Sequence, residues 1–365
     1  MLQIETPAVL VDLDKLEINL NDMASFSSKQ GIALRPHIKA HKTPEIALKQ
    51  LESGASGITV ATLKEAEVML DAGIRDIFIA YQVTGQDKLN RLKKLITEAD
   101  LSAAVDSLEG AWFLASTARA AGEELPVLLE INTGLNRCGV LPGAQALQLA
   151  RSVSEFPDLY LKGIFTHAGQ VYGAASEAEV AEIGRHEGQA TVDTAQLLKR
   201  EGFPLDVVSV GSTPTAKIAG QVEGITEIRP GNYVFYDAIQ VGLGVVSLEK
   251  CALRVRAGVI SKPAEGRIII DAGSKTMALD QGAHGTEVVA GYGMLINNPG
   301  LTIPKLSEEH GIIQSSADRD QEPAIGDQVE IIPNHACVTV NLTEHLVMTR
   351  QGQVIDSWQV AARGR

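Results

Sequence analysis

Apolar runs and amphipathic segments alternate along the first part of the chain. Between about residue 15 and residue 230, short runs rich in Val and Ile are followed by amphipathic stretches of ten or more residues. The runs predict eight strands, at 32–39, 57–62, 76–81, 101–106, 126–132, 160–167, 205–210 and 225–230. The stretches between them, such as 63–73, 108–122 and 177–202, predict helices, several of which end at a glycine. Eight strand–helix pairs fit an α/β fold of the (β/α)8 TIM type better than an open sheet.

The pattern changes after about residue 245. Short alternating strands separated by turn residues predict a C-terminal β domain. We therefore expect a barrel over residues 1–245 and a β domain over residues 246–365. The N-terminal segment ETPAVLVDL is expected either to join the barrel or to pair as a strand with the β domain.

Composition and charge restrict the possible partners. With 32 Lys and Arg against 45 Asp and Glu, the net charge is −13, which argues against nucleic acid. The acidic residues Glu5, Asp12 and Asp14 argue against a signal peptide, and no run of 18 apolar residues predicts a membrane span. The three cysteines, Cys138, Cys251 and Cys337, form no CxxC pair and predict neither a disulfide framework nor a zinc ribbon. We expect a soluble, cytoplasmic protein.

Polar residues follow several of the predicted strands, at the barrel end that carries chemistry in this architecture. Lys39 follows the first strand, where partial desolvation releases a neutral amine for Schiff-base formation, although a surface lysine fits the same position. Gly211-Ser212-Thr213 follows the seventh strand and Gly231-Asn232 the eighth. Backbone N–H groups at these two loops suit a phosphate, although a Gly-Ser-Thr turn is equally an ordinary helix cap. Together with Lys39, the loops predict a lysine-bound aldehyde cofactor with a phosphate, pyridoxal 5′-phosphate (PLP).

A second pair of chemical groups follows the apolar run QVEII in the β domain. If the segment is extended, His335 and Cys337 point to the same side and present an imidazole and a thiolate to one metal ion. A buried histidine beside an ordinary cysteine is the alternative interpretation. Two protein ligands leave positions open for water or substrate, as metal-assisted catalysis requires.

At these residues the chain resembles the fold-type III PLP enzymes and, among them, the D-threonine aldolase/D-serine dehydratase family. The matching stretches, spread over residues 6–342, include RPHIKAHKT, INTGLNRCGV, FTHAGQVYG, VGSTPT, EIRPGNYVFYD and PNHACVTVNL. The resemblance implies an alanine racemase-like barrel in which Lys39 is bonded to PLP. It also implies that Arg137 and His167 face the cofactor and that Tyr172 lines the substrate side. The phosphate is then held by Gly211, Ser212, Thr213, Gly231, Asn232 and Tyr236.

The resemblance also implies an activity. Members of the family cleave or dehydrate D-amino acids with a β-hydroxyl group, with a divalent metal bound by the C-terminal domain. The pair His335 and Cys337 resembles the dehydratase branch, so we expect a D-serine or D-3-hydroxy amino acid dehydratase that yields a keto acid and ammonia. D-threonine aldolase is the alternative, and an amino-acid racemase or a non-catalytic PLP-binding protein is less expected. The thiolate favours zinc over magnesium, with manganese as the other candidate.

Three further expectations concern partners. By the same resemblance the protein is a homodimer. Its substrate is a small D-amino acid, with neither nucleic acid nor membrane as a partner. A cation near the pocket, Lys42 or Lys275, would favour a carboxylate as the β-substituent.

Overall fold

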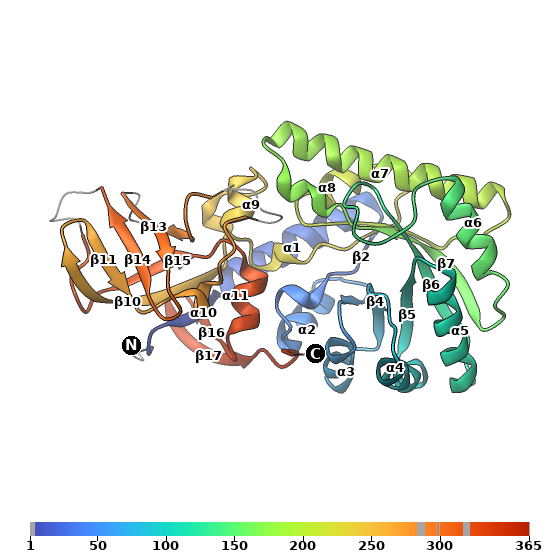
Figure 1. The fold of residues 1–365 in the computed structure, drawn as a ribbon, viewed down its shortest axis with the longest axis horizontal. Coiled ribbons are helices and arrows are strands. Elements are labelled where there is room, and N and C mark those ends of the chain that lie inside the picture. The colour runs from blue at the N-terminus through green and yellow to red at the C-terminus, as the bar shows by residue number, and fades with distance from the viewer. Residues whose placement is uncertain (1–3, 283–288, 297, 299, 317–321, 365) are drawn as a thin grey trace.

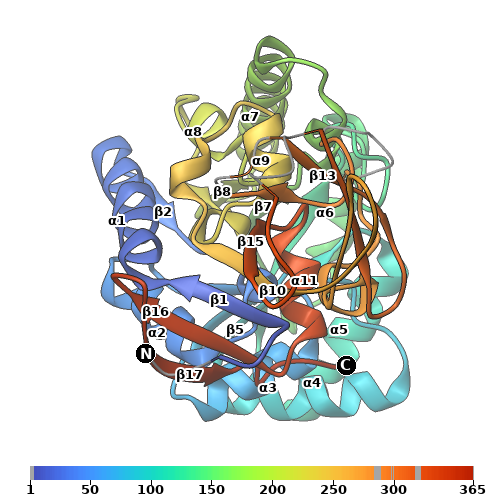
Figure 2. The ribbon, with the colours of Figure 1, turned by 90° about the vertical axis from the view of Figure 1, so that its left-hand side faces the viewer.

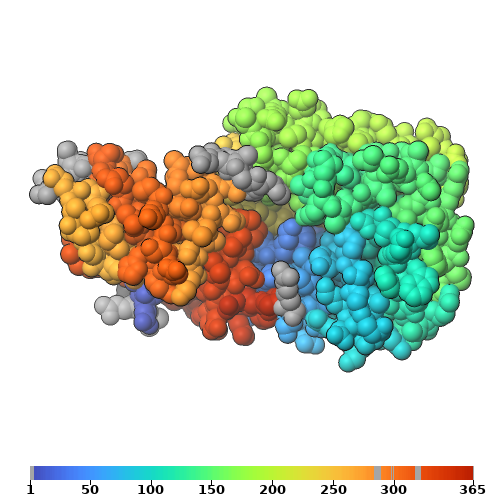
Figure 3. Space-filling model, in the orientation of Figure 1, coloured from blue at the N-terminus to red at the C-terminus, as the bar shows by residue number. Residues whose placement is uncertain are grey.

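Two lobes lie side by side in the computed structural model, which describes residues 4–364 apart from 283–288, 297, 299 and 317–321. Helices surround one lobe, and strands dominate the other (Figure 1). The space-filling view shows the two lobes in contact through the C-terminal part of the chain (Figure 3). None of the helices in the described ranges is both long and apolar enough to cross a membrane.

An eight-stranded parallel sheet forms the first lobe. Its strands run in the order β2-β9-β8-β7-β6-β5-β4-β3. They are β2 (Ala33–Leu34), β3 (Ile58–Val60), β4 (Asp76–Ile79), β5 (Asp100–Val105), β6 (Leu125–Ile131), β7 (Leu159–Thr166), β8 (Val207–Val210) and β9 (Glu227–Ile228). A parallel bridge between His37 and Thr59 joins the β2 segment to β3 and closes the curl. The sequence-based prediction of eight strands in an alanine racemase-like barrel is confirmed.

Helices cover the outside of this sheet (Figure 1). They are α1 (Leu13–Gln30), α2 (Pro44–Glu52), α3 (Leu63–Asp71), α4 (Gln86–Glu98), α5 (Leu108–Ala121), α6 (Ala144–Val153), α7 (Glu177–Arg200) and α8 (Ala216–Ala219). Local signals set their ends, as α5 illustrates. The Ser107 hydroxyl accepts from the N–H of Gly110 at its start, and Gly122 ends it in the left-handed conformation.

The first strand is shorter than predicted. The run 32–39 was expected to be extended throughout, but β2 ends at Leu34 and the chain turns into the 3-10 helix η1 (Ile38–Ala40). Pro36 has no N–H with which to continue a strand ladder. The imidazole of His37 accepts the N–H of Lys39 and caps the turn. Lys39 therefore lies on a short helix at the barrel mouth.

A nine-stranded mixed sheet forms the second lobe. Its strands are β1 (Ala8–Asp12), β10 (Leu253–Ala264), β11 (Arg267–Ile270), β12 (Met294–Leu295), β13 (Leu301–Leu306), β14 (Gly311–Ser315), β15 (Gln328–Ile332), β16 (His345–Arg350) and β17 (Gln353–Gln359). Of the two arrangements open for the N-terminal segment, the structure has the second, because β1 pairs with β10 and β16 (Figure 2). The chain reaches this lobe through η3 (Asn232–Val234), α9 (Ala238–Gly242) and η4 (Leu248–Lys250). A domain boundary at residue 245 stays a prediction.

Two short helices, α10 (Ser274–Met277) and α11 (Ala336–Leu342), belong to the second lobe. Helix α11 contacts η1, so the element that begins after His335 meets the element that carries Lys39. In Figure 1, α11 lies between the strands of the second lobe and α2 of the barrel. The junction between the lobes therefore lies at the C-terminal end of the barrel strands.

Candidate active site

Lys39 lies at the barrel mouth in a strongly polar environment. Burial lowers the pKa of its ammonium group, and the guanidinium groups of Arg137 and Arg229 lower it further. The nearby Cys337 and Glu65 raise the pKa of Lys39 and offset part of this decrease. A lowered pKa makes the neutral amine, which is the nucleophilic form, more accessible near neutral pH.

Two histidines share this space with Lys39. His167 follows β7 and donates Nδ1–H to the carbonyl of Gly211 over 2.9 Å, while Nδ1 of His37 accepts the N–H of Lys39. Burial lowers the pKa of both imidazoles well below 6.5, and the charge of Lys39 adds to the effect. Both rings are therefore neutral at physiological pH. Sequence reasoning assigned His167 to the site and left His37 out, although His37 stands two residues before Lys39.

The loop after β8 is held from behind by a buried carboxylate that the sequence analysis missed. Glu187 of α7 accepts the N–H of Gly211 over 2.9 Å and the hydroxyl of Thr215 over 2.6 Å. The N–H of Gly211 is therefore not available to a ligand. Gly211 has φ +151°, and its lack of a side chain allows the backbone of Arg229 to pack against it. A Cβ at this position would lie only 2.8 Å from the backbone nitrogen of Arg229.

Four N–H groups of the two loops remain for an anion. Within the described ranges, no protein acceptor binds the backbone N–H groups of Ser212, Thr213, Gly231 and Asn232, and these four residues are buried. The loops adjoin, since the N–H of Tyr233 donates to the Thr213 hydroxyl. Buried N–H groups without partners are rare in proteins. Their grouping fits a phosphate ester of the kind that PLP carries.

Tyr236 lies beside this cradle. Its backbone has φ +50°, and its side chain is buried. Together with Thr213 and Pro214 it lines a cavity of about 310 Å³. Burial raises the pKa of its hydroxyl well above 10, so the group remains protonated and able to donate.

Tyr172 lies on η2 (Gly169–Gly173), which follows β7. Its hydroxyl accepts from the Gln240 side chain over 3.4 Å. Burial and the nearby Cys337 raise the pKa of Tyr172. Because Cys337 acts on both Lys39 and Tyr172, the three side chains converge on one space. Buried acceptor oxygens of Gln240 and Asn232 have no partner among the described residues, which fits donors from a bound molecule.

The segment His335–Cys337 differs from the sequence-based expectation. It was predicted as an extended stretch, but β15 ends at Ile332, and Cys337 lies in the first turn of α11 with His335 as the N-cap. The chain turns here because the buried Asp237 carboxylate accepts the N–H of Ala336 over 2.9 Å. The imidazole and the thiol nevertheless lie within hydrogen-bonding reach of each other. An imidazole and a thiol in contact form a donor pair that suits zinc.

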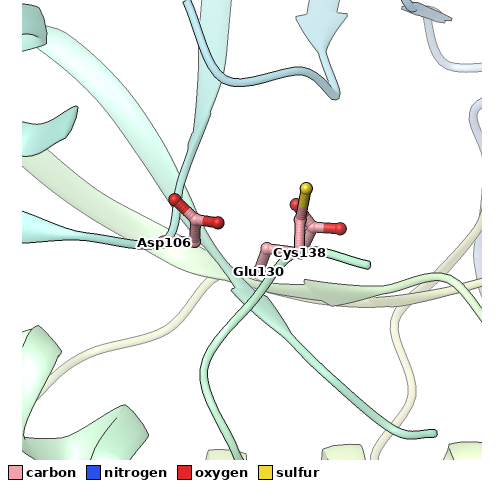
Figure 4. Close-up of side chains that lie close together, drawn as sticks. All are labelled: Asp106, Glu130 and Cys138. Atoms are coloured by element: carbon pink, nitrogen blue, oxygen red, sulfur yellow. The ribbon is translucent and has the colours of Figure 1, made fainter. Parts of the chain in front are cut away.

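Arg137 follows β6 and is half-exposed at the rim. Its Nη2 lies 3.9 Å from Oε1 of Glu130. Glu130 also belongs to a group of metal-type ligands that the sequence analysis missed: the ligand atoms of Asp106, Glu130 and Cys138 lie within 4.8 Å of one another (Figure 4). Gln82 donates to Glu130, and the N–H of Gly139 donates to Asp106. Both acids therefore already have protein partners, Gln82 and Arg137 for Glu130 and the N–H of Gly139 for Asp106.

The two candidate cations for a β-carboxylate differ in position. Lys42 lies next to the site, where it donates to Asn341 of α11 over 2.9 Å and lies 3.5 Å from Glu65. Lys275 forms an exposed ion pair with Glu309 over 2.7 Å. Both ammonium groups already have carboxylate partners.

Two family models match the chain. Residues 11–238 match the alanine racemase N-terminal domain, and residues 252–349 match the putative serine dehydratase domain. D-threonine aldolase of Arthrobacter sp. is 35% identical over 99% of this chain and 93% of its own length. D-threo-3-hydroxyaspartate dehydratase of Delftia sp. strain HT23 is 37% identical over 93% of this chain and 92% of its own length.

Solved structures of the same kinds of enzyme match nearly the whole chain. The crystal structure of D-threonine aldolase from Filomicrobium marinum has a TM-score of 0.92 and 32% identity, covering 99% of this chain and 95% of that one. A mutant of D-threo-3-hydroxyaspartate dehydratase in the metal-free form has a TM-score of 0.90 and 35% identity, covering 98% of this chain and 97% of that one.

Proposed function

Because this chain belongs to the family that joins an alanine racemase N-terminal domain to a D-serine dehydratase domain, we propose that it is a PLP- and metal-dependent lyase of D-β-hydroxy amino acids. Dehydration to a keto acid and ammonia is the reaction we favour. The observation that carries the proposal is the contact of α11 with η1, which brings the thiol of Cys337 into the surroundings of Lys39.

The residues of the chain fit both groups. The free N–H groups at Ser212, Thr213, Gly231 and Asn232 would hold the phosphate of PLP, and Lys39 would bond to its aldehyde carbon. The pair His335 and Cys337 would hold the metal, for which we favour zinc. When bound, PLP supplies an electron sink for a carbanion at Cα, and the metal supplies a Lewis acid for the β-hydroxyl.

Proton transfer falls to Lys39. With a lowered pKa, its amine can take the proton from Cα of the substrate once it is released from the cofactor. The neutral rings of His37 and His167 add no further positive charge beside Lys39, where Arg137 and Arg229 already lower the pKa of the amine. The hydroxyl of Tyr172, which burial keeps protonated, would donate to a substrate oxygen on the side of Cys337.

D-threonine aldolase activity is the second candidate, favoured by the 35% identity to the Arthrobacter aldolase. A product assay separates the two. Purified protein with PLP and zinc or manganese is given D-serine, D-threonine and D-threo-3-hydroxyaspartate, and keto acid and glycine are followed in parallel. Metal-dependent keto acid identifies a dehydratase, whereas glycine with an aldehyde identifies an aldolase. Neither product from any substrate contradicts the proposal.

We propose in addition that the protein is a cytoplasmic homodimer. Large apolar side chains are exposed near the C-terminal ends of β4, β5 and β6: Tyr81, Leu108, Trp112 and Leu141. Because these strands are neighbours in the sheet, the side chains gather on one part of the rim. An apolar rim of this kind is typical of a protein interface. Sedimentation analysis tests the dimer.

A further inference from the structure

His335 has a carboxylate partner that the sequence did not single out. Nδ1 of His335 donates to Oδ2 of Asp280 over 2.8 Å. A carboxylate only accepts, so Nδ1 carries the proton, and in the neutral ring the lone pair lies at Nε2. The thiol of Cys337 lies within hydrogen-bonding reach of the same ring. Asp280 thus selects the tautomer that leaves one nitrogen free for a metal beside the sulfur.

Hydrogen bonds from the neighbouring Asn334 fix the position of Asp280 relative to His335. The side chain of Asn334, which is 2% exposed, donates to the carbonyl of Asp280 over 2.9 Å and to that of Gly291 over 2.8 Å. Its oxygen accepts the N–H of Gly293 over 2.8 Å. Since Asn334 directly precedes His335, one buried amide fixes the spacing between the carboxylate and the imidazole. Asn334, the asparagine of the stretch PNHAC, therefore positions Asp280 beside His335.

The position of Asp280 is that of a supporting group and not of a third ligand. In the described part of the chain, Asp280 forms no group with His335 and Cys337 in which all ligand atoms lie within 4.8 Å of one another. The protein therefore offers two ligands at this point, with the carboxylate behind the imidazole. Side-chain exposure of 30% for His335 and 38% for Asp280 leaves the pair accessible from solvent.

We propose that Asp280 is a positioning residue for the metal centre: it orients the His335 ring, fixes its tautomer and strengthens Nε2 as a donor. A carboxylate behind a ligating histidine raises the basicity of the ligating nitrogen and removes the freedom of the ring to rotate. The inference rests on the proposed function, because it presupposes that His335 and Cys337 bind a metal. Asp280 touches neither substrate nor cofactor and acts through His335.

The test is the zinc affinity of the metal-free protein, which needs no activity. Zinc is titrated against a chromophoric chelator in wild-type protein, Asp280→Ala and Asp280→Asn. Loss of the supporting carboxylate lowers metal affinity by about 10–100-fold, so Asp280→Ala should bind zinc that much more weakly. Asp280→Asn keeps an acceptor oxygen of the same shape and should recover part of the loss.

Controls separate this role from general stability and from the proposed metal site. Glu309→Ala removes an exposed, ion-paired carboxylate of the same lobe and should bind zinc as the wild type does. The melting temperature of metal-free Asp280→Ala should equal that of the metal-free wild type. Wild-type zinc affinity in Asp280→Ala overturns the role of Asp280. Wild-type affinity in His335→Ala instead overturns the metal site on which the inference rests.

Discussion

The side-chain amide of Asn232 lies 3.8 Å from the sulfur of Cys337. Asn232 belongs to the loop after the last barrel strand, and Cys337 to helix α11 of the second lobe. The same amide donates to the buried carboxylate of Asp237 over 2.5 Å, and Asp237 accepts the N–H of Ala336 between the two proposed metal ligands. One asparagine thus connects the proposed phosphate cradle to the proposed metal site.

Replacing this asparagine should therefore weaken both sites. Asn232→Ala leaves a buried carboxylate with one fewer donor, which costs about 1–3 kcal/mol. We expect PLP and zinc to bind roughly tenfold more weakly, as measured by separate titrations of apo-protein. Loss of affinity for one ligand alone would contradict the coupling.

Lys39→Ala should remove the covalent attachment of PLP, because no other amine replaces it on η1. The visible absorption of lysine-bound PLP should disappear, and borohydride treatment should no longer fix the cofactor to the chain. Lys88→Ala, which alters an exposed lysine of α4, serves as the control and keeps both signals. A native absorption band in Lys39→Ala would remove the assignment.

Cys337→Ala should lower turnover by about tenfold or more, since it removes a proposed ligand of a catalytic metal. Treatment of the wild type with a chelator should have a similar effect, and added zinc or manganese should restore activity. Cys251→Ala, in the core, should retain the metal content of the wild type. Full activity after chelation would contradict a role for the metal.

Glu187→Gln should weaken the binding of PLP, although residue 187 lies behind the loop after β8 and makes no proposed contact with the cofactor. An amide cannot accept both the N–H of Gly211 and the hydroxyl of Thr215 through two oxygens, so one buried donor is left unpaired at a cost of about 1–3 kcal/mol. The dissociation constant of PLP should rise by roughly tenfold or more. Glu182→Gln, on the exposed side of the same helix, should bind PLP as the wild type does.

Buried His41 should contribute to acid sensitivity. Burial lowers its pKa from 6.5 to about 4, where its ring bonds to Gln50 and Thr43. Below pH 6.5 the unfolded chain takes up a proton that the folded protein does not take up until about pH 4, so stability falls as the pH falls through this range. The free energy of unfolding should drop by roughly 3 kcal/mol from this group alone.

Urea unfolding at pH 7 and pH 5 tests this contribution. His41→Gln should reduce the difference in unfolding free energy between the two pH values. His186→Gln, on the exposed face of α7, should leave the difference as in the wild type. An unchanged difference in His41→Gln would contradict the contribution of His41.

The sequence by itself determined the elements and the identity of the reactive groups. The eight strands and the helices between them follow from apolar periodicity, because each strand is buried in a parallel sheet and each helix buries one face. Lys39, the loops after β8 and β9, and the pair at His335 and Cys337 stand at points where periodic runs end, and those positions are visible in the chain.

Only the tertiary structure decided how these groups meet. The pairing of β1 with β10 and β16 joins segments more than 200 residues apart, and no local pattern specifies such a partner. The supporting residues Asp280, Asp237 and Glu187 were missed for the same reason. A buried carboxylate on a helix or loop resembles any other acid until the fold shows which donors it receives. The turn at His335 likewise depends on the hydrogen bond from the N–H of Ala336 to Asp237, 99 residues away from Ala336, which overrides the local tendency to extend.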